Sequence, residues 1–420
     1  MHHIPSIWIQ IIRVLIVGAV FTLFLNKNGL QPLAILASLL ALPIVIIKRH
    51  LFTRDQLLAA LVICVFFFSV VLTETLHSGP SFSSTVLDAP SRHPLAAITF
   101  LFIVMYGVNE RIFWYSWWIA SATSFIQSMF HLNYLPTSLF GYTPTWLLGS
   151  QAWTTGVQAF ATMALVSAGV TLFTPASFAD TWIKKIILLT CAGLGLVAAL
   201  SSGTRAPFLA LAALIPLLAL HHRQWLKLIL YSVVVGGLVV IVSLYLDSHR
   251  LILSKFKAID NEVHCFLTTD EPCGSVGMRL AMYEGGVRAF LDKPFIGHGM
   301  NSAETMEKLV EKGFMRDIPV LTNFHNDFIQ IAATQGLIGL IPFMGMLIYM
   351  SHRISNRSIK TEKERSSTNA CLWILASILI CSQTQLNFDR TSTTSFFIFS
   401  LAFLGGISFH HQYVGQHPTG

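Results

Sequence analysis

Charged residues are scarce in this sequence. They make up 11% of the 420 residues, whereas hydrophobic residues make up 54%. A soluble globular domain has about 25% charged residues, so the composition excludes an ordinary soluble enzyme. Apolar runs long enough to cross a bilayer recur along the chain, which predicts an all-α, polytopic membrane protein.

Several catalytic signatures are also missing. The sequence contains no Walker phosphate loop, no His-Glu-x-x-His zinc motif, no paired-aspartate motif for nucleotide sugars, no Gly-x-Ser-x-Gly elbow and no Cys-x-x-Cys pair. No cluster of side chains has the spacing of metal ligands. We therefore expect chemistry that runs without ATP, a bound metal or another cofactor.

Hydropathy predicts about twelve membrane-spanning helices. The expected spans are residues 7–25, 32–47, 57–73, 94–108, 112–130, 152–173, 185–201, 206–221, 225–246, 327–350, 370–387 and 394–410. No small-residue cleavage site follows the first span, so we expect it to be retained rather than removed as a signal peptide.

The distribution of basic residues predicts the orientation in the membrane. Residues 48–54, 184–185, 221–227 and 353–365 form basic loops that all lie on one side if the N-terminus is inside. An even number of spans then places both termini inside. The net charge of +7 is explained by these loops facing anionic lipid, and it does not require a nucleic acid partner.

One long hydrophilic segment, approximately 247–324, interrupts the spans and lies outside in this topology. Helical periodicity at 278–290 and 302–312 predicts a small folded cap rather than a linker. The expected division is residues 1–246 for the first nine transmembrane helices, 247–325 for the periplasmic loop domain, and 326–420 for the last three helices and a cytoplasmic tail.

The six cysteines fall into two groups. Cys265 and Cys273 lie eight residues apart in the long loop, where a short disulfide would suit an oxidising compartment. Two free thiols are the alternative. The other four lie within the expected spans and are interpreted as apolar filler: Cys64, Cys191, Cys371 and Cys381.

Because ionisable groups are costly at membrane depth, each one near the outer end of a span is a functional candidate. The first such cluster is the turn at 201–207. Thr204 suits a helix N-cap and Pro207 a first helical turn, which places Arg205 beside a helix N-terminus that favours an anion. The alternative is an arginine that reaches lipid head groups.

The second cluster lies in the long loop. Arg279 and Tyr283 share one face of a helix by their i, i+4 spacing. Arg288 is either part of the same site or one half of a weak surface pair with Glu284. The Pro-x-x-Gly-x-Gly sequence at 294–299 predicts a turn whose backbone lies close to another element.

The third candidate is His325, where the long loop enters a hydrophobic helix. Asn323 or Asn326 is expected to cap that helix, and Gly336 and Gly339 would let another helix approach closely. An imidazole at this position can exchange protons at neutral pH. The alternative is a histidine satisfied by head groups or a backbone carbonyl.

A fourth and weaker candidate lies in the short outer turn between the last two spans. Asp389 is suited to orient a histidine or to pair with an arginine of the site. The alternative is an ordinary turn residue that pairs with its neighbour Arg390.

Together these motifs resemble the O-antigen ligase superfamily. The resemblance rests on Ser-Gly-Thr-Arg-Ala at 202–206, Arg279 followed by Tyr-Glu-Gly-Gly, Lys-Pro-Phe-x-Gly-x-Gly at 293–299, and Phe-His-Asn-x-Phe at 324–328 with a later Gly-x-x-Gly. It extends from about residue 185 to residue 400. The superfamily includes O-antigen ligases, O-antigen polymerases and protein O-oligosaccharyltransferases.

The resemblance implies a glycosyltransferase C-type fold and a metal-independent, inverting reaction. An O-antigen chain would pass from undecaprenyl diphosphate to the lipid A-core oligosaccharide, at the periplasmic face of a bacterial inner membrane. By the family pattern, His325 would be catalytic, and Arg205 and Arg279 would bind the diphosphate. Supporting positions would be Asp389, Tyr283, Arg288 and Asn326.

Other functions remain open at this point. A polymerase or a protein O-oligosaccharyltransferase would differ only in its acceptor. A lipid or glycan transporter would carry charges near the membrane midplane in paired halves. Here the outside-facing charges concentrate at one membrane surface, which favours surface chemistry over passage.

Overall fold

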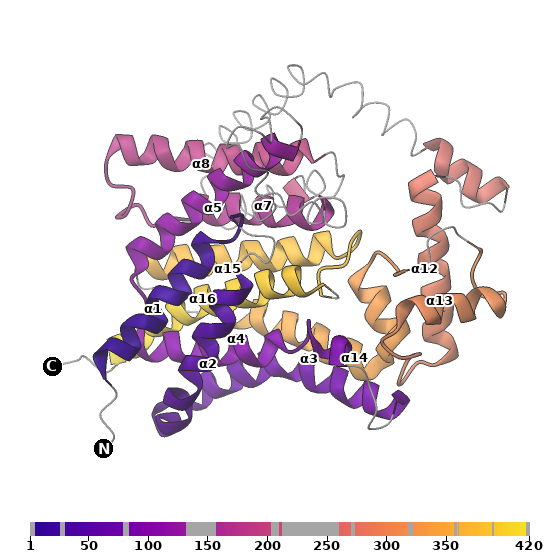
Figure 1. Ribbon diagram of the computed structural model, residues 1–420, viewed down its shortest axis with the longest axis horizontal. Helices are drawn as coiled ribbons and strands as arrows, with labels where there is room; N and C mark the ends of the chain where they lie inside the picture. Colours follow the sequence, from indigo (N-terminus) through magenta and orange to yellow (C-terminus); the bar gives the residue numbers. More distant parts are fainter. Residues whose placement is uncertain are drawn as a thin grey trace, which may run out of the picture.

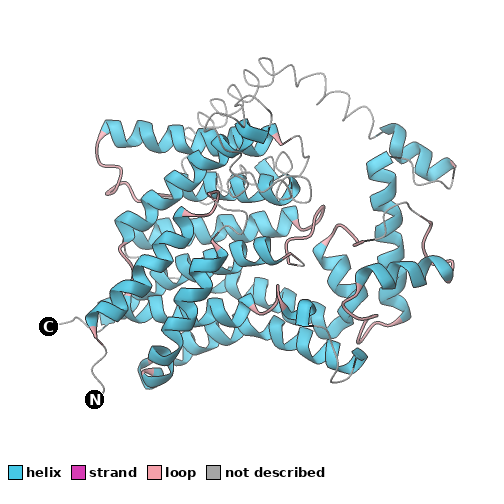
Figure 2. Ribbon diagram, in the orientation of Figure 1, coloured by secondary structure: helices cyan, strands magenta, loops and turns pink. Residues whose placement is uncertain are grey.

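A computed structural model of the chain describes residues 5–25, 30–78, 84–131, 157–202, 210–211, 260–269, 274–317, 322–356, 359, 361–388 and 390–416. Every regular element within these residues is a helix (Figure 2). The all-α prediction is therefore confirmed for the described part of the chain.

Helices occupy ten of the twelve expected spans or overlap them. The bundle comprises α1 (Ser6–Phe21), α2 (Gln31–Ile47), α3 (Arg54–Ser78), α4 (Arg92–Tyr106), α5 (Glu110–His131), α7 (Val157–Leu172), α8 (Trp182–Ser201), α14 (Asp327–Ser355), α15 (Glu362–Cys381) and α16 (Thr391–Gln416), with single turns η1 (Arg49–Leu51) and η3 (Ser84–Leu87). The predicted spans 206–221 and 225–246 lie outside the described residues, except for residues 210–211.

Four of the described helices are long and apolar enough to cross a membrane by themselves: α3, α8, α14 and α16. The chain is thus a helical membrane protein, whereas the number of crossings stays a prediction. The start of α1 and the end of α16 lie at the same end of the bundle (Figure 1), as expected if both termini are on one side.

The last two spans differ in their bounds from the hydropathy prediction. α15 begins at Glu362 rather than at residue 370 and ends at Cys381 rather than at 387. A reciprocal capping box between Thr361 and Glu364 starts this helix on polar residues. A hydropathy window detects the apolar run but not the capped polar turns that precede it.

α16 lies at the centre of the bundle, and its phenylalanines fill the core. Phe396, Phe397, Phe399 and Phe403 are fully buried. A chain of ring contacts runs from Phe66 of α3 through Phe343 of α14 to Phe388, which contacts Phe397. These phenylalanines thus serve packing of the bundle.

α14 is broken in the middle. Gly336 has φ 60° and ψ −152°, a backbone conformation that ends one helical segment and starts another. Residues 294–299 of the loop domain insert at the break. The carbonyls of Pro294 and Phe295 accept from the N–H groups of Leu337 and Ile338, at 2.8 and 3.1 Å.

The opposite side of the break is bridged in the same way. The N–H groups of His298 and Gly299 donate to the carbonyls of Ala333 and Thr334, at 3.0 and 2.9 Å. An unpaired backbone group at membrane depth costs several kcal/mol, so irregular backbone survives there only where protein satisfies it. The predicted close approach of the 294–299 backbone is confirmed. The expectation that a helix packs on Gly336 was wrong, because the turn at residues 294–299 packs there instead.

The 294–299 segment and α14 approach so closely that both need glycine at the contact. A Cβ on Gly336 would lie 2.5 Å from the carbonyl carbon of Phe295, and a Cβ on Gly297 would lie 2.3 Å from that of Thr334. Both glycines also have positive φ. The glycines of the Lys-Pro-Phe-x-Gly-x-Gly box therefore have a steric role.

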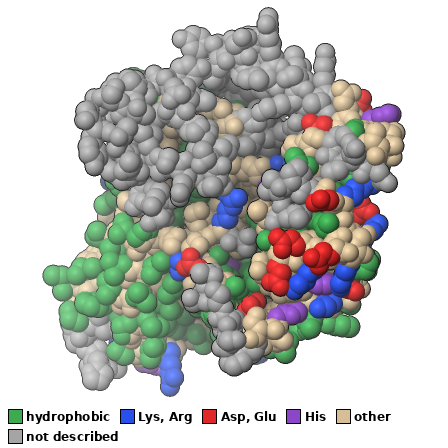
Figure 3. All heavy atoms as spheres, turned by 45° about the vertical axis from the view of Figure 1, so that its right-hand side comes forward, with side chains coloured by type: hydrophobic (Ala, Val, Ile, Leu, Met, Phe, Trp, Pro, Cys, Tyr) green, Lys and Arg blue, Asp and Glu red, His purple; other side chains and the backbone are tan. Residues whose placement is uncertain are grey.

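The long loop contains two helices at the predicted places, α12 (Gly274–Asp292) and α13 (Ser302–Glu311), preceded by a short helix at 260–268. They share a small core made of Met282, Met306, Leu309, Met315 and Phe324. α12 runs across the direction of α14 and α16 (Figure 1). Charged side chains gather on this part of the visible face, whereas the bundle beside it is largely apolar (Figure 3).

The cysteines follow the predicted division. Cys265, in the loop domain, is disulfide-bonded. Its predicted partner, Cys273, lies outside the described residues. The four cysteines in the helices of the bundle are free thiols that are partly or fully buried.

The break in α14 can be tested with one substitution. Gly336→Ala should lower the stability of the purified protein by about 2 kcal/mol or more, because alanine is strained at this φ and meets the Phe295 backbone. Thermal unfolding in detergent measures the effect. Gly345→Ala in the same helix is the control: its Cβ meets open space, so helix propensity should leave stability equal or slightly higher. Equal stability of Gly336→Ala and the control would contradict a required break.

Candidate functional site

His325 lies where the loop domain joins α14. Its φ is 51°, and it is the one residue other than glycine with a positive φ among the described residues. The backbone N–H donates to Asn323 Oδ1 at 3.1 Å, which helps to hold the strained turn. Left-handed backbone at a non-glycine residue persists only where its surroundings impose it.

Asn326 begins α14. Its Oδ1 accepts from the N–H groups of Phe328 and Ile329, at 2.9 and 3.2 Å, so the predicted N-cap is confirmed for this asparagine. Its Nδ2 donates to the Gln383 carbonyl at 3.1 Å. The cap therefore also ties α14 to the turn between α15 and α16.

Tyr283 of α12 reaches the same point. Its hydroxyl donates to the Gln383 carbonyl at 2.8 Å and lies 3.4 Å from the His325 carbonyl. Burial raises the pKa of the Tyr283 phenol, and the nearby Arg279 offsets part of that effect. Three segments far apart in the sequence thus converge on one carbonyl, with His325 at their junction.

Asp327 also binds the turn between α15 and α16. Its carboxylate is buried and accepts from the N–H groups of Asn387, at 3.0 Å to each oxygen, and of Phe388 at 3.1 Å. Its own N–H donates to the Ser382 carbonyl at 3.0 Å. Sequence reasoning missed this role, because an aspartate in the first turn of a helix is already explained by the helix dipole.

Two arginines from different parts of the chain lie near His325. Burial, then the positive charges of Arg279 and Arg390, lower the pKa of His325 to about 4. The imidazole is therefore neutral at neutral pH and able to accept a proton. Arg279 lies on α12, and Arg390 directly precedes α16.

The sequence did not indicate that Arg390 lies near His325. From the sequence, Arg390 was expected only as an alternative partner for Asp389. The structure brings it to the histidine because Asp327 fixes residues 387 and 388 against the start of α14. An unexplained cation immediately before the last span was the available signal.

The other predicted positions divide into two groups. Arg205 and Asp389 lie outside the described residues. Arg288 forms a surface pair with Glu284, at 2.6 Å and with its side chain 49% exposed. Its placement therefore agrees with the surface alternative rather than with a role at His325.

The glycine box is anchored on the bundle by α3. His77 Nε2 lies 2.9 Å from the Ile296 carbonyl, and the buried Glu74 carboxylate accepts from the Met300 N–H at 3.4 Å. On the other side, His298 Nε2 lies 3.1 Å from the Ala289 carbonyl of α12. The loop domain is thereby fixed to α3 and α14 next to the site.

Chemically, the site offers one neutral proton acceptor and two guanidinium groups at one end of the bundle. Guanidinium groups bind phosphate oxygens through a rigid fork of donors. Among the described residues, no three His, Cys, Asp or Glu side chains gather closely enough to hold a metal ion. The expectation of a metal-independent reaction stays a prediction.

The Asp327 anchor gives a direct test of this geometry. Asp327→Ala should destabilise the protein by about 3 kcal/mol or more, because buried N–H groups lose a charged acceptor. Hydrogen exchange at residues 382–388, together with thermal unfolding, measures the loss. Asp260→Ala, at an exposed position, should change stability by less than about 0.5 kcal/mol. Unchanged exchange at 382–388 in Asp327→Ala would show that the carboxylate does not hold the turn.

Part of this site lies in a segment that matches a known protein family. Residues 190–344 match the family model described as O-antigen ligase, a segment that includes Arg279, the glycine box, His325 and the break in α14. No curated protein matches the chain. The motifs on which the sequence resemblance rested lie within the matched segment, so this part of the chain is similar to the O-antigen ligase family.

Proposed function

We propose that the protein is an O-antigen ligase. It transfers an O-antigen chain from undecaprenyl diphosphate to a sugar hydroxyl of the lipid A-core oligosaccharide, on the periplasmic face of the inner membrane. The observation that carries the proposal is His325, kept neutral by burial beside Arg279 and Arg390 at the start of α14. The match of residues 190–344 to the O-antigen ligase family model, whose members are glycosyltransferase-like enzymes, supports it.

The acceptor hydroxyl is a poor nucleophile, and its proton must leave during attack. In the proposed step its oxygen attacks the anomeric carbon while the proton passes to the His325 imidazole. The bond between the anomeric carbon and the diphosphate oxygen breaks, and undecaprenyl diphosphate leaves with the electron pair. Attack opposite the leaving group inverts the anomeric centre.

The leaving group gains negative charge as this bond breaks. Arg279 is suited to that charge because its guanidinium stays protonated and offers two parallel donors. Hydrogen bonds to charged groups contribute about 1.5–3 kcal/mol each. Arg390 adds a second positive charge near the imidazole, and Arg205 is proposed as a further diphosphate ligand.

The same charges couple donor binding to proton transfer. In the free protein the two arginines help to lower the pKa of His325. A bound diphosphate would offset their positive charge and raise that pKa again. The imidazole would then become a stronger base when the donor is in place, and would stay neutral at other times.

The proposal is tested by reconstitution in liposomes with a lipid-linked O-antigen. Three acceptors are supplied separately: lipid A-core, a second lipid-linked repeat unit, and a serine- and threonine-rich peptide. Transfer to lipid A-core alone is the expected result. Transfer only to the repeat unit would identify a polymerase, transfer only to the peptide a protein O-oligosaccharyltransferase, and glycan movement without any product a transporter.

His325→Ala should abolish transfer, with a loss of at least about 100-fold, which is the lower range for general base catalysis. Protein yield and thermal unfolding should be essentially unchanged, because alanine keeps the backbone hydrogen bond to Asn323 that holds this turn. His352→Ala, at the exposed far end of α14, is the control and should keep full activity. Activity of His325→Ala equal to that of the control would exclude the imidazole as the base.

The contributions of the charge of Arg279 and of the geometry of its guanidinium can be tested separately. Arg279→Gln removes a positive charge, so the pKa of His325 should rise from about 4 toward its ordinary value near 6.5. Arg279→Lys keeps the charge and should leave that pKa low, yet it should lose activity because the fork is gone. Histidine NMR, with His325→Ala identifying the signal, measures the pKa.

Arg288→Gln is the control for both measurements, because Arg288 pairs with Glu284 at the surface. It should leave the His325 pKa and the activity unchanged. A His325 pKa that stays near its starting value in Arg279→Gln would contradict the proposed electrostatic coupling.

A further inference from the structure

A second site lies between α1 and α5, at the end of the bundle where α1 begins and α16 ends. The cavity there has a volume of about 830 Å³. This volume is within the range of small-molecule sites, roughly 300–1,000 Å³. None of the residues assigned to glycan transfer lines it.

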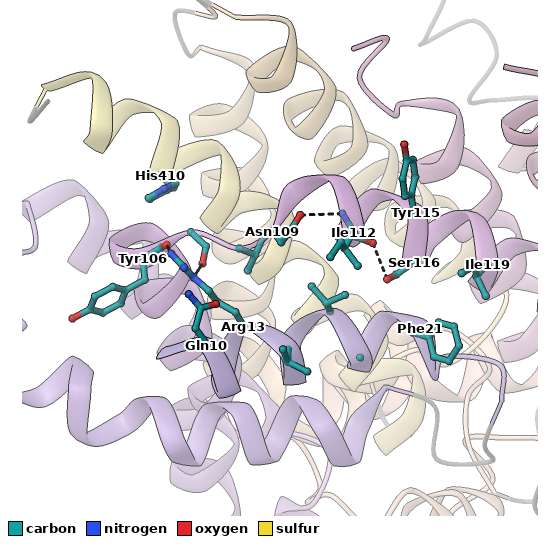
Figure 4. A pocket seen from close by; sticks show the side chains of 15 residues that line it. Gln10, Arg13, Phe21, Tyr106, Asn109, Ile112, Tyr115, Ser116, Ile119 and His410 are labelled. Carbon is teal, nitrogen blue, oxygen red and sulfur yellow. Dashed lines mark hydrogen bonds between the residues drawn. The ribbon is translucent and has the colours of Figure 1, made fainter. Parts of the chain in front are cut away.

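The charged side chain and the large apolar side chains line different ends of the cavity. Arg13, Tyr106 and His410 lie toward one end, whereas Phe21 and Ile119 lie toward the other (Figure 4). Exposed apolar side chains of both helices, Val14 on α1 and Ile112 on α5, line the cavity as well. A ligand that fits must therefore have a polar end and an apolar chain.

Arg13 is the charged residue of this cavity. Its Nε donates to the Gly107 carbonyl at 3.2 Å, and a terminal nitrogen donates to the Tyr106 carbonyl, at the end of α4. These carbonyls are neutral, so the arginine keeps its charge, and a guanidinium has five N–H donors in all. An arginine within an apolar helix is costly and marks a functional site by default.

The depth of Arg13 also suits a lipid head group. It is the eighth residue of α1, which places it about 10 Å along the helix axis from the first residue. The head-group region of a bilayer extends roughly 5–8 Å beyond the hydrocarbon core on each side. Because the expected span begins at residue 7, the Cα of Arg13 would lie about 9 Å inside the hydrocarbon core, and its long side chain would extend toward the head groups to meet a lipid phosphate.

We propose that this cavity binds an anionic phospholipid of the inner leaflet. The head group would contact Arg13, and an acyl chain would lie along Val14, Phe21, Ile112 and Ile119. The positive charge complements the anionic head, and basic pockets between transmembrane helices on the cytoplasmic side are suited to such lipids. The proposal does not depend on glycan transfer, because it concerns the opposite end of the bundle.

The test is lipid binding to the purified full-length protein, measured by native mass spectrometry. Phosphatidylglycerol and phosphatidylcholine with the same acyl chains are compared, and phosphatidylglycerol should bind about fivefold more tightly. Arg13→Gln should remove that preference, whereas Val14→Trp, which fills the cavity, should weaken the binding of both lipids.

Two matched variants serve as controls. Arg54→Gln removes an exposed basic residue at the same end of the bundle, and Ile11→Trp adds a tryptophan to an exposed position of α1 that does not line the cavity. Both should bind as the wild type does. His325→Ala should also keep lipid binding, so a failure of the proposed catalysis would be distinguishable from a failure of this site.

The proposal is overturned if the wild type binds the two lipids equally, or if the preference survives Arg13→Gln. Should Arg13→Gln fail to fold, Val14→Trp decides the matter. Undiminished binding in that variant would place the lipid elsewhere on the protein surface.

Discussion

The organisation of this protein depends on the break in α14 at Gly336. A helix interrupted within the membrane leaves N–H and C=O groups without partners, each at a cost of several kcal/mol. Residues 294–299 pair with those groups on both sides of the break. The loop domain is therefore joined to the bundle by backbone hydrogen bonds, not only by side-chain packing. Only glycine fits at Gly336 and Gly297, because a Cβ atom on either residue would lie within 2.6 Å of the backbone of the other segment.

That junction positions the chemistry. The first half of α14 begins at Asn326 and Asp327, which bind the turn between α15 and α16. His325 therefore meets Arg390 from that turn and Arg279 from α12 at one place. The arginines lower the pKa of the histidine, so the group that would accept the acceptor's proton and the groups that would bind the donor's diphosphate influence each other. In the proposed reaction, the negative charge of the bound donor would therefore raise the pKa of His325.

The two ends of the bundle use arginine for different purposes. At the end that carries His325, the cations surround a proton acceptor beneath a folded domain. At the other end, Arg13 binds the carbonyls that close α4 and borders a cavity with an apolar floor. In both places a costly charge near the membrane is held by backbone or by neighbouring side chains, which keeps it in a fixed position for a ligand.

Local patterns determined much of this structure in advance. Hydropathy located ten of the bundle's helices, periodicity located α12 and α13, and Asn326 was one of the two asparagines expected to cap α14. Spacing along a helix also put Arg279 on the face that meets His325. Only the tertiary structure decided the anchoring by Asp327, the proximity of Arg390 to His325 and the packing of the 294–299 turn at Gly336. These depend on hydrogen bonds and charges between residues 35 to 65 positions apart, and no periodicity or spacing within one helix encodes which distant segments will meet.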